Sequence, residues 1–122
     1  MDVAVKSALA QCACAMLVCA CGSSTIQNVE TLRYTKYTVA QCLAKAYPET
    51  PVARDAQVAL GGYLEHGALD ESAYSAATDL ATQTVSTKYE NLTGEQLHVA
   101  KCLDLLGSPA LERLANRYVN NR

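Results

Sequence analysis

The chain has 122 residues, a length that suits one domain. Hydrophobic residues make up 50% of it, yet Trp and Phe are absent, so seven Tyr supply all of the aromatic bulk. The formal net charge of −2 argues against nucleic-acid binding, because contact with phosphates requires a basic surface.

The first 22 residues have the pattern of an export signal. Lys6 precedes a run of small and apolar residues over 7–21 that only Gln11 interrupts. A membrane-spanning helix needs about 20 apolar residues, and this shorter run is typical of a signal-peptide core. We therefore predict a signal peptide over 1–22 and a protein that works outside the cytoplasm.

A second interpretation of the same segment is a lipid anchor. Val18-Cys19-Ala20-Cys21 loosely resembles a bacterial lipoprotein box, in which Cys21 would carry the lipid. Val18 stands where such boxes usually have Leu, three residues before the lipidated Cys. A lipid-anchored form and a free form are therefore both retained, and a lipid on Cys21 would be the protein's one attachment to a membrane.

This predicted leader, residues 1–22, also contains four of the six cysteines. They are spaced as two Cys-x-Cys pairs: Cys12 and Cys14, then Cys19 and Cys21. Thiolate pairs bind zinc, but the segment between these ligands has no His and no turn-forming Gly. A leader that is removed also offers no scaffold for tetrahedral coordination. We expect no metal and no other cofactor.

After a linker over 23–32, the body has apolar residues at helical spacing. Capping residues, Gly and Pro mark the ends of the predicted helices. The first predicted helix covers 34–47 and ends before Pro48. Thr50 caps the second, which ends at His66. Gly61 and Gly62 inside it cost about 1 kcal/mol each relative to Ala, a loss that a close helix crossing would offset. The residues expected to face the core are Val39, Cys42, Leu43 and Ala46 in the first helix and Val58, Leu60 and Leu64 in the second.

Three further helices follow. Asp70 caps the third, over 71–84; Thr93 and Gln96 form a capping box for the fourth, which ends at Gly107; and Ser108 caps the fifth. Their expected core residues are Tyr74, Ala77, Leu80 and Ala81, then Leu97, Val99, Cys102, Leu103 and Leu106, then Leu111, Leu114, Ala115 and Tyr118. We therefore predict an all-α domain over 33–122, a compact bundle of about five helices.

Cys42 and Cys102 are the two cysteines outside the leader. Both fall on apolar helix faces, and a pair of cysteines in an exported chain predicts one disulfide. The bond would join the first helix to the fourth and close a loop of about 60 residues, which the chain-entropy model values at about 4 kcal/mol. The alternative is two buried free thiols, which a reducing compartment would require.

One pair of residues has the minimum for catalysis. His98 and Cys102 are four residues apart on one predicted helix, so a base would lie beside a thiol. The expected disulfide would remove that thiol, and the sequence has no phosphate loop, serine elbow or zinc-binding His pair. We predict that the protein is not an enzyme and keep an extracellular thiol enzyme as an alternative.

The charges are unevenly distributed along the body. No Lys or Arg occurs from Asp55 to Thr87, where five acidic residues lie: Asp55, Glu65, Asp70, Glu71 and Asp79. A solvated face and a surface that steers toward a basic partner both fit this pattern. Residues 85–94 are polar, and we expect them to form a projecting loop.

Four segments of the body, in order, carry a family resemblance. They are residues 34–43 with the first Cys, 59–67 with the ending Tyr63-Leu-Glu65-His66-Gly67, 69–74, and 99–105 with the second Cys. Together they resemble the immunity proteins that protect type VI secreting bacteria against the fourth family of peptidoglycan amidase effectors. His66 stands where that family has an aromatic residue.

The resemblance implies a periplasmic protein, often a homodimer, that inhibits a cognate amidase by occluding its substrate groove and performs no chemistry itself. We expect the projecting loop to enter the groove, with Tyr89 as the anchor, because Tyr buries a large area at little entropic cost. The candidate contact residues are Lys88, Tyr89, Glu90, Asn91 and Thr93 in the loop and Asp70 and Glu71 in the acidic stretch. The alternative from another class is a structural or adaptor lipoprotein of the envelope.

Overall fold

The computed structural model describes residues 20–89 and 91–121. These residues form five α-helices, α1 (Ala20–Ala46), α2 (Pro51–His66), α3 (Glu71–Ser86), α4 (His98–Leu103) and α5 (Pro109–Ala115), and a π-helical turn, η1 (Asn116–Asn120), continues α5. The described part contains no strand, which confirms the predicted all-α class. The predicted signal peptide lies almost entirely outside the described residues, and so do Cys12, Cys14 and Cys19.

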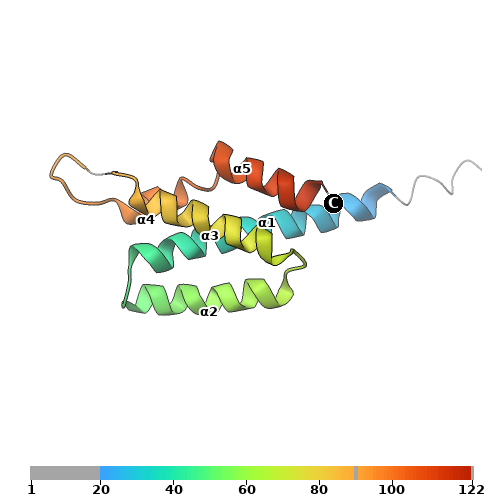
Figure 1. The fold of residues 1–122 in the computed structure, drawn as a ribbon, viewed down its shortest axis with the longest axis horizontal. Coiled ribbons are helices and arrows are strands. Elements are labelled where there is room, and N and C mark those ends of the chain that lie inside the picture. The colour runs from blue at the N-terminus through green and yellow to red at the C-terminus, as the bar shows by residue number, and fades with distance from the viewer. Residues whose placement is uncertain (1–19, 90, 122) are drawn as a thin grey trace, which may run out of the picture.

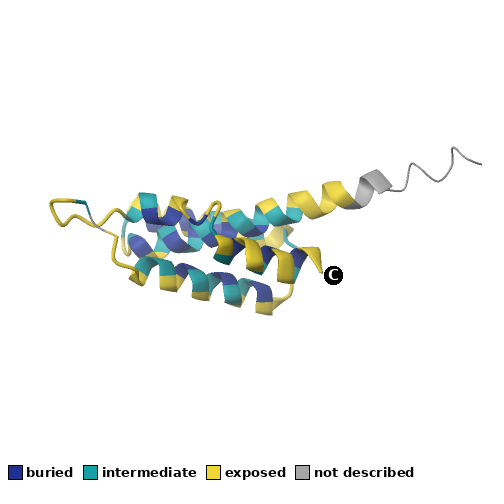
Figure 2. Cartoon of the chain, turned by 90° about the horizontal axis from the view of Figure 1, so that it is seen from above, coloured by how far each residue is buried: buried dark blue, intermediate teal, exposed yellow. Residues whose placement is uncertain are grey.

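Helix α1 is the central element of the bundle. It packs against α2 along one side and against α3 along another, while α4 and α5 pack on α3 and on the remaining surface of α1 (Figure 1). The N-terminal part of α1 extends beyond the other helices, and its residues 24–29 are exposed (Figure 2). No helix of the described residues is both long and apolar enough to span a membrane.

Side-chain caps begin two of the helices as the sequence predicts. The Thr50 hydroxyl accepts a hydrogen bond from the Ala53 N–H at 3.3 Å, and the Ser108 hydroxyl accepts one from the Leu111 N–H at 3.2 Å. Each of these helices has Pro in its first turn, where the missing N–H costs no hydrogen bond. Asp70 occupies the N-cap position of α3, but its side chain makes no capping hydrogen bond.

Small side chains make the helix contacts close. Eight buried alanines line the facing surfaces, namely Ala40, Ala46, Ala53, Ala56, Ala73, Ala77, Ala81 and Ala115. Tyr34 and Tyr37 of α1 fill the space between α1 and α3, where the ring of Tyr37 lies edge-on to that of Tyr74 with centroids 4.9 Å apart. The predicted inner face of α3 is confirmed, since Ala77 and Ala81 are buried and Tyr74 and Leu80 pack against the core.

The predicted disulfide is present. Cys42 of α1 and Cys102 of α4 are joined, with their Cα atoms 5.6 Å apart, and both side chains are fully buried. The first helix is therefore bonded to the fourth across 60 residues of sequence.

The start of the first helix differs from the prediction. Residues 23–32, expected as a linker, are helical and belong to α1, which begins at Ala20 instead of residue 34. The Glu30 carboxylate pairs with Arg33 one turn later and accepts a hydrogen bond from the Ala68 N–H at 3.2 Å. These contacts hold the last turn of the segment against the α2–α3 connection.

The predicted fourth helix is wrong in length and in orientation. Helix α4 has six residues, and the capping box of Thr93 and Gln96 does not form, because the backbone turns back on itself before His98. The buried residues of this region are Lys101, Cys102 and Leu105, whereas four residues that we expected in the core are at least 36% exposed: Leu97, Val99, Leu103 and Leu106.

The predicted inner face of α2 is also partly wrong. Ala53, Ala56 and Leu60 are buried, whereas Val58 and Leu64 are exposed. A Cβ atom added at Gly61 or Gly62 would meet nothing within 4 Å, so no close helix crossing offsets these two glycines. The helix faces α1 with its smallest side chains because these allow the closest approach.

Candidate functional site

The segment between α3 and α4, residues 87–97, which we call the α3–α4 loop, projects from one end of the bundle (Figure 1, at the left). Its two arms pair through the Leu97 N–H, which donates to the Tyr89 carbonyl at 2.9 Å, and the Asn91 N–H, which donates to the Glu95 carbonyl at 3.1 Å. The projecting loop expected from the sequence is therefore a narrow, hydrogen-bonded hairpin.

Asn91 organises the tip of this loop. Its Oδ1 accepts hydrogen bonds from the backbone N–H groups of Thr93 and Glu95, both at 3.0 Å, and from the Thr93 hydroxyl at 2.8 Å. Its Nδ2 donates to the Glu95 carboxylate at 2.7 Å. Gly94 has a φ of 83°, a conformation that favours glycine. The polar groups of Asn91 and Thr93, predicted to bind the effector, thus have partners within the loop.

Tyr89, the expected anchor, also has a partner within the chain. Its hydroxyl donates to the Asp104 carboxylate at 2.7 Å, which joins the first arm of the loop to the residue just after α4. This hydrogen bond and the negative charge of the carboxylate raise the pKa of Tyr89. The ring is 39% exposed, so Tyr89 retains an accessible face.

Lys101 holds the other arm. Its side chain is only 4% exposed, and Nζ donates to the Val85 carbonyl in the last turn of α3 at 3.0 Å and to Gln96 Oε1 at 3.4 Å. Lysines are seldom buried unless their ammonium group is hydrogen-bonded. Lys101 thus ties the end of α3, the second arm of the loop and α4 together.

Leu92 at the loop tip is fully exposed. Neither Leu92 nor the pair Lys101 and Asp104 is among the candidates expected from the sequence. An apolar residue isolated in a polar segment is the signal for Leu92. For Lys101 and Asp104 the signal is their place on either side of Cys102, within the segment 99–105 that carries the family resemblance.

The acidic candidates lie elsewhere. Asp70 and Glu71 are exposed at the start of α3, at the opposite end of the bundle from the loop (Figure 1). The 16 residues of α3 separate them from the loop by about 24 Å at 1.5 Å per residue. The structure therefore does not join the loop and acidic candidates into one site. Glu90 lies outside the described residues.

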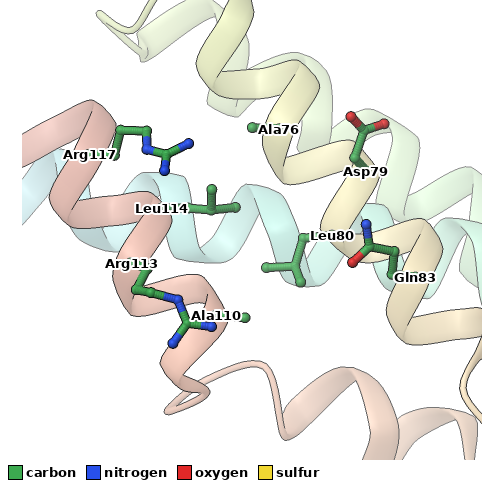
Figure 3. A pocket seen from close by; sticks show the side chains of 8 residues that line it. All are labelled: Ala76, Asp79, Leu80, Gln83, Ala110, Arg113, Leu114 and Arg117. Atoms are coloured by element: carbon green, nitrogen blue, oxygen red, sulfur yellow. The ribbon is translucent and has the colours of Figure 1, made fainter.

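Two hollows lie beside α3. One, of about 320 Å³, runs between α3 and α5, where Asp79 and Gln83 lie across from Arg113 and Arg117 over an apolar floor (Figure 3). The other, also about 320 Å³, lies at the base of the α3–α4 loop and is lined mainly by apolar atoms, with Tyr89 and Asp104 among its walls. The second adjoins the loop and belongs to the same surface.

The alternative catalytic pair is contradicted by the disulfide. Cys102 is bonded to Cys42, so it offers no thiol, and the His98 ring packs edge-on against Tyr47 with centroids 5.5 Å apart. The described residues contain no group of three His, Cys, Asp or Glu side chains that could hold a metal ion. The structure therefore directs attention to surfaces that bind a partner.

Comparison with known proteins gives two findings. The model of a family described as "Type VI secretion system (T6SS), amidase immunity protein" matches residues 33–115. The fold is similar to a solved chain from the Tae4/Tai4 effector–immunity system of Salmonella typhimurium, with a TM-score of 0.66 and 24% identity over 72% of this chain and 87% of that chain. No curated protein matches the sequence.

Proposed function

This chain belongs to the family of type VI secretion system amidase immunity proteins, and from that premise we propose that it inhibits a cognate peptidoglycan amidase in the periplasm. By doing so it would protect the cell from intoxication by that amidase. The observation that carries the proposal is the family match over residues 33–115, which covers the part of the chain that holds the disulfide and the α3–α4 loop.

Inhibition would occur by occlusion of the substrate groove, and the α3–α4 loop is the element that suits this role. It projects from the bundle, it is narrow, and its backbone and polar side chains are hydrogen-bonded within the chain. A loop that is already ordered loses little entropy when it binds, so more of the contact energy is available for affinity. The protein would act by binding alone, without chemistry of its own.

A location in the periplasm is supported by the leader and by the disulfide. Residues 7–21 have the apolar pattern of a signal-peptide core, and a buried disulfide is typical of proteins that fold in an oxidising compartment. Either a free form or a form anchored through a lipid on Cys21 would meet an amidase there.

We also propose that two copies pair through the outer surface of α1 and α2. A hollow of about 410 Å³ lies between these helices, and the exposed Leu32, Val52 and Leu106 line it together with Lys36 and Asp55. Both copies in a two-fold interface use the same surface, so Lys36 and Asp55 of each copy would lie in the contact. Light scattering of the wild type and of a Lys36→Glu variant would test this pairing: a wild-type monomer contradicts it.

The central test is rescue from intoxication. The cognate amidase is directed to the periplasm, with and without this protein, and lysis is followed. We expect the full chain to prevent lysis, and a variant with residues 91–95 replaced by Gly and Ser to prevent it poorly. Lysis despite soluble, exported wild-type protein would refute the inhibitor proposal and favour an adaptor role in the envelope.

A further inference from the structure

We propose that Leu92 is the residue that anchors this protein in its partner, and that the α3–α4 loop presents it to an apolar pocket of the amidase groove. The proposal further assigns Asp104 and Lys101 as positioning residues that fix the direction of the loop. It rests on the proposed function and refines it, since it replaces Tyr89 as the anchor and states the chemistry of the surface that receives the loop.

The polar side chains at the tip of the loop bond to one another. Asn91, Thr93 and Glu95 form five side-chain-mediated hydrogen bonds with one another, at 2.7, 2.8, 3.0, 3.0 and 3.2 Å. These internal bonds use part of the hydrogen-bonding capacity of the three side chains. Their role in the free protein is to shape the tip.

The tip shaped in this way presents one apolar side chain to solvent. Leu92 lies between Asn91 and Thr93 and is fully exposed, more so than any other large hydrophobic residue that the structure describes. A leucine in this position gains nothing for the fold, whereas its burial in a partner would remove apolar surface from water. Polar neighbours around an apolar anchor are the arrangement of an energetic centre with a rim that excludes water. The matching surface is an apolar pocket, not a basic one.

Hydrogen bonds at the stem restrain the direction of the loop. On one arm, the Tyr89 hydroxyl is held by Asp104 at 2.7 Å. On the other arm, Gln96 is held by Lys101, whose Nζ also bonds the Val85 carbonyl at 3.0 Å. Asp104 and Lys101 are close in sequence and lie on either side of Cys102, which the disulfide fixes to α1. The direction of the tip is thereby fixed relative to α1, to which Cys102 is bonded.

The first experiment measures, by calorimetry, the dissociation constant of the full mature chain for its purified cognate amidase. Leu92→Ala should weaken binding by about 10- to 100-fold, mainly through faster dissociation, with an unchanged melting temperature. Leu64→Ala is the matched control, because Leu64 is 46% exposed on α2 near the end opposite the loop. It should change the dissociation constant less than about twofold, within the scatter of surface substitutions.

The outcomes separate this inference from the proposed function. If Leu92→Ala binds like the wild type while the Gly/Ser replacement of residues 91–95 does not, the loop is the inhibitory element and Leu92 is not its anchor. If both bind like the wild type, the loop assignment itself is wrong. A loss of affinity equal to that of Leu64→Ala would also overturn the inference.

The second experiment tests the positioning role of Asp104. Tyr89→Phe, Asp104→Ala and the double variant should weaken binding to a similar extent, since each breaks the same hydrogen bond, and the double change should cost no more than one of the singles. Hydrogen exchange of the Leu97 amide should become faster in all three. If Asp104→Ala weakens binding and Tyr89→Phe does not, Asp104 contacts the partner directly and the positioning role is refuted.

Discussion

At the scale of single residues, Tyr34 connects two helices through the core. Its side chain is fully buried, and its hydroxyl donates to the Ala73 carbonyl in the first turn of α3 at 2.7 Å. Tyr34→Phe keeps the ring and removes this hydrogen bond. We expect the free energy of unfolding to fall by about 1–2 kcal/mol, measured by urea denaturation at neutral pH; an unchanged midpoint would mean that the bond adds nothing net.

The burial of Tyr34 also makes the stability of the folded state depend on pH. Burial raises the pKa of Tyr34 above its ordinary value of 10.0, and it raises that of Tyr74 as well. The folded state therefore keeps protons that the unfolded state loses above about pH 10, so stability is full below that pH and falls as the pH rises further. Urea midpoints from pH 8 to 11 should show this decline, and Tyr34→Phe should make it shallower.

Gly67 and Gly61 make a matched pair for a test of close approach. A Cβ at Gly67 would lie 1.9 Å from the Tyr74 hydroxyl and 2.8 Å from the Tyr63 carbonyl, whereas one at Gly61 would meet nothing within 4 Å. Gly67→Ala should destabilise the protein by about 1–3 kcal/mol, and Gly61→Ala should stabilise it by about 0.5–1 kcal/mol. Thermal denaturation of both variants distinguishes the two positions.

At the scale of elements, the limits of several helices could be predicted because local chemistry sets them. Thr50 and Ser108 cap their helices as expected, and Gly67 follows the end of α2. The faces of α2 and the extent of α4 could not be predicted, because they depend on distant partners. On α2 the alanines face α1 and leave Val58 exposed, although Val58 is the more hydrophobic.

The candidate site could likewise be predicted only in part from the sequence. A projecting segment between α3 and α4 could be predicted from its polarity, but its hairpin pairing replaces the expected capping box of Thr93 and Gln96. The importance of Lys101 and Asp104 depends on the positions of Val85 and Tyr89, which are far along the chain and meet them only in the folded state. No local sequence pattern predicts such contacts.

A substitution of Lys101 can test whether this residue restrains the α3–α4 loop. Lys101→Met keeps a buried, unbranched stem but removes the hydrogen bonds to Val85 and Gln96. We expect the unfolding free energy to fall by about 1.5–3 kcal/mol, the value for a hydrogen bond to a charged group. Cleavage within residues 87–97 by a broad-specificity protease should become faster, as read by mass spectrometry, while the helices stay intact. Equal cleavage of both proteins would show that Lys101 does not restrain the loop.

At the scale of the whole molecule, the disulfide compensates for a core of small residues. Helix α4 has only six residues, too few to be stable alone, and its buried surface consists mainly of Lys101 and Cys102. The bond to Cys42 holds it against α1. Because Lys101 and Asp104 flank Cys102, the same bond places both residues that restrain the loop, so that stability and presentation of the loop depend on one covalent link.

This dependence predicts that oxidation and inhibition are coupled. A Cys42→Ala, Cys102→Ala variant should lose about 4 kcal/mol of stability by the chain-entropy model for a loop of this length, measured by urea denaturation. At a temperature where it is still folded, it should bind the amidase more weakly than the wild type, because α4 and the loop sample directions unsuited to binding and only the competent fraction contributes. The variant is preferable to added reductant, which would also act on thiols of the amidase. If the variant were destabilised but bound with wild-type affinity at that temperature, the disulfide would serve the fold alone, and the loop would take its direction from Asp104 and Lys101 without help from α1.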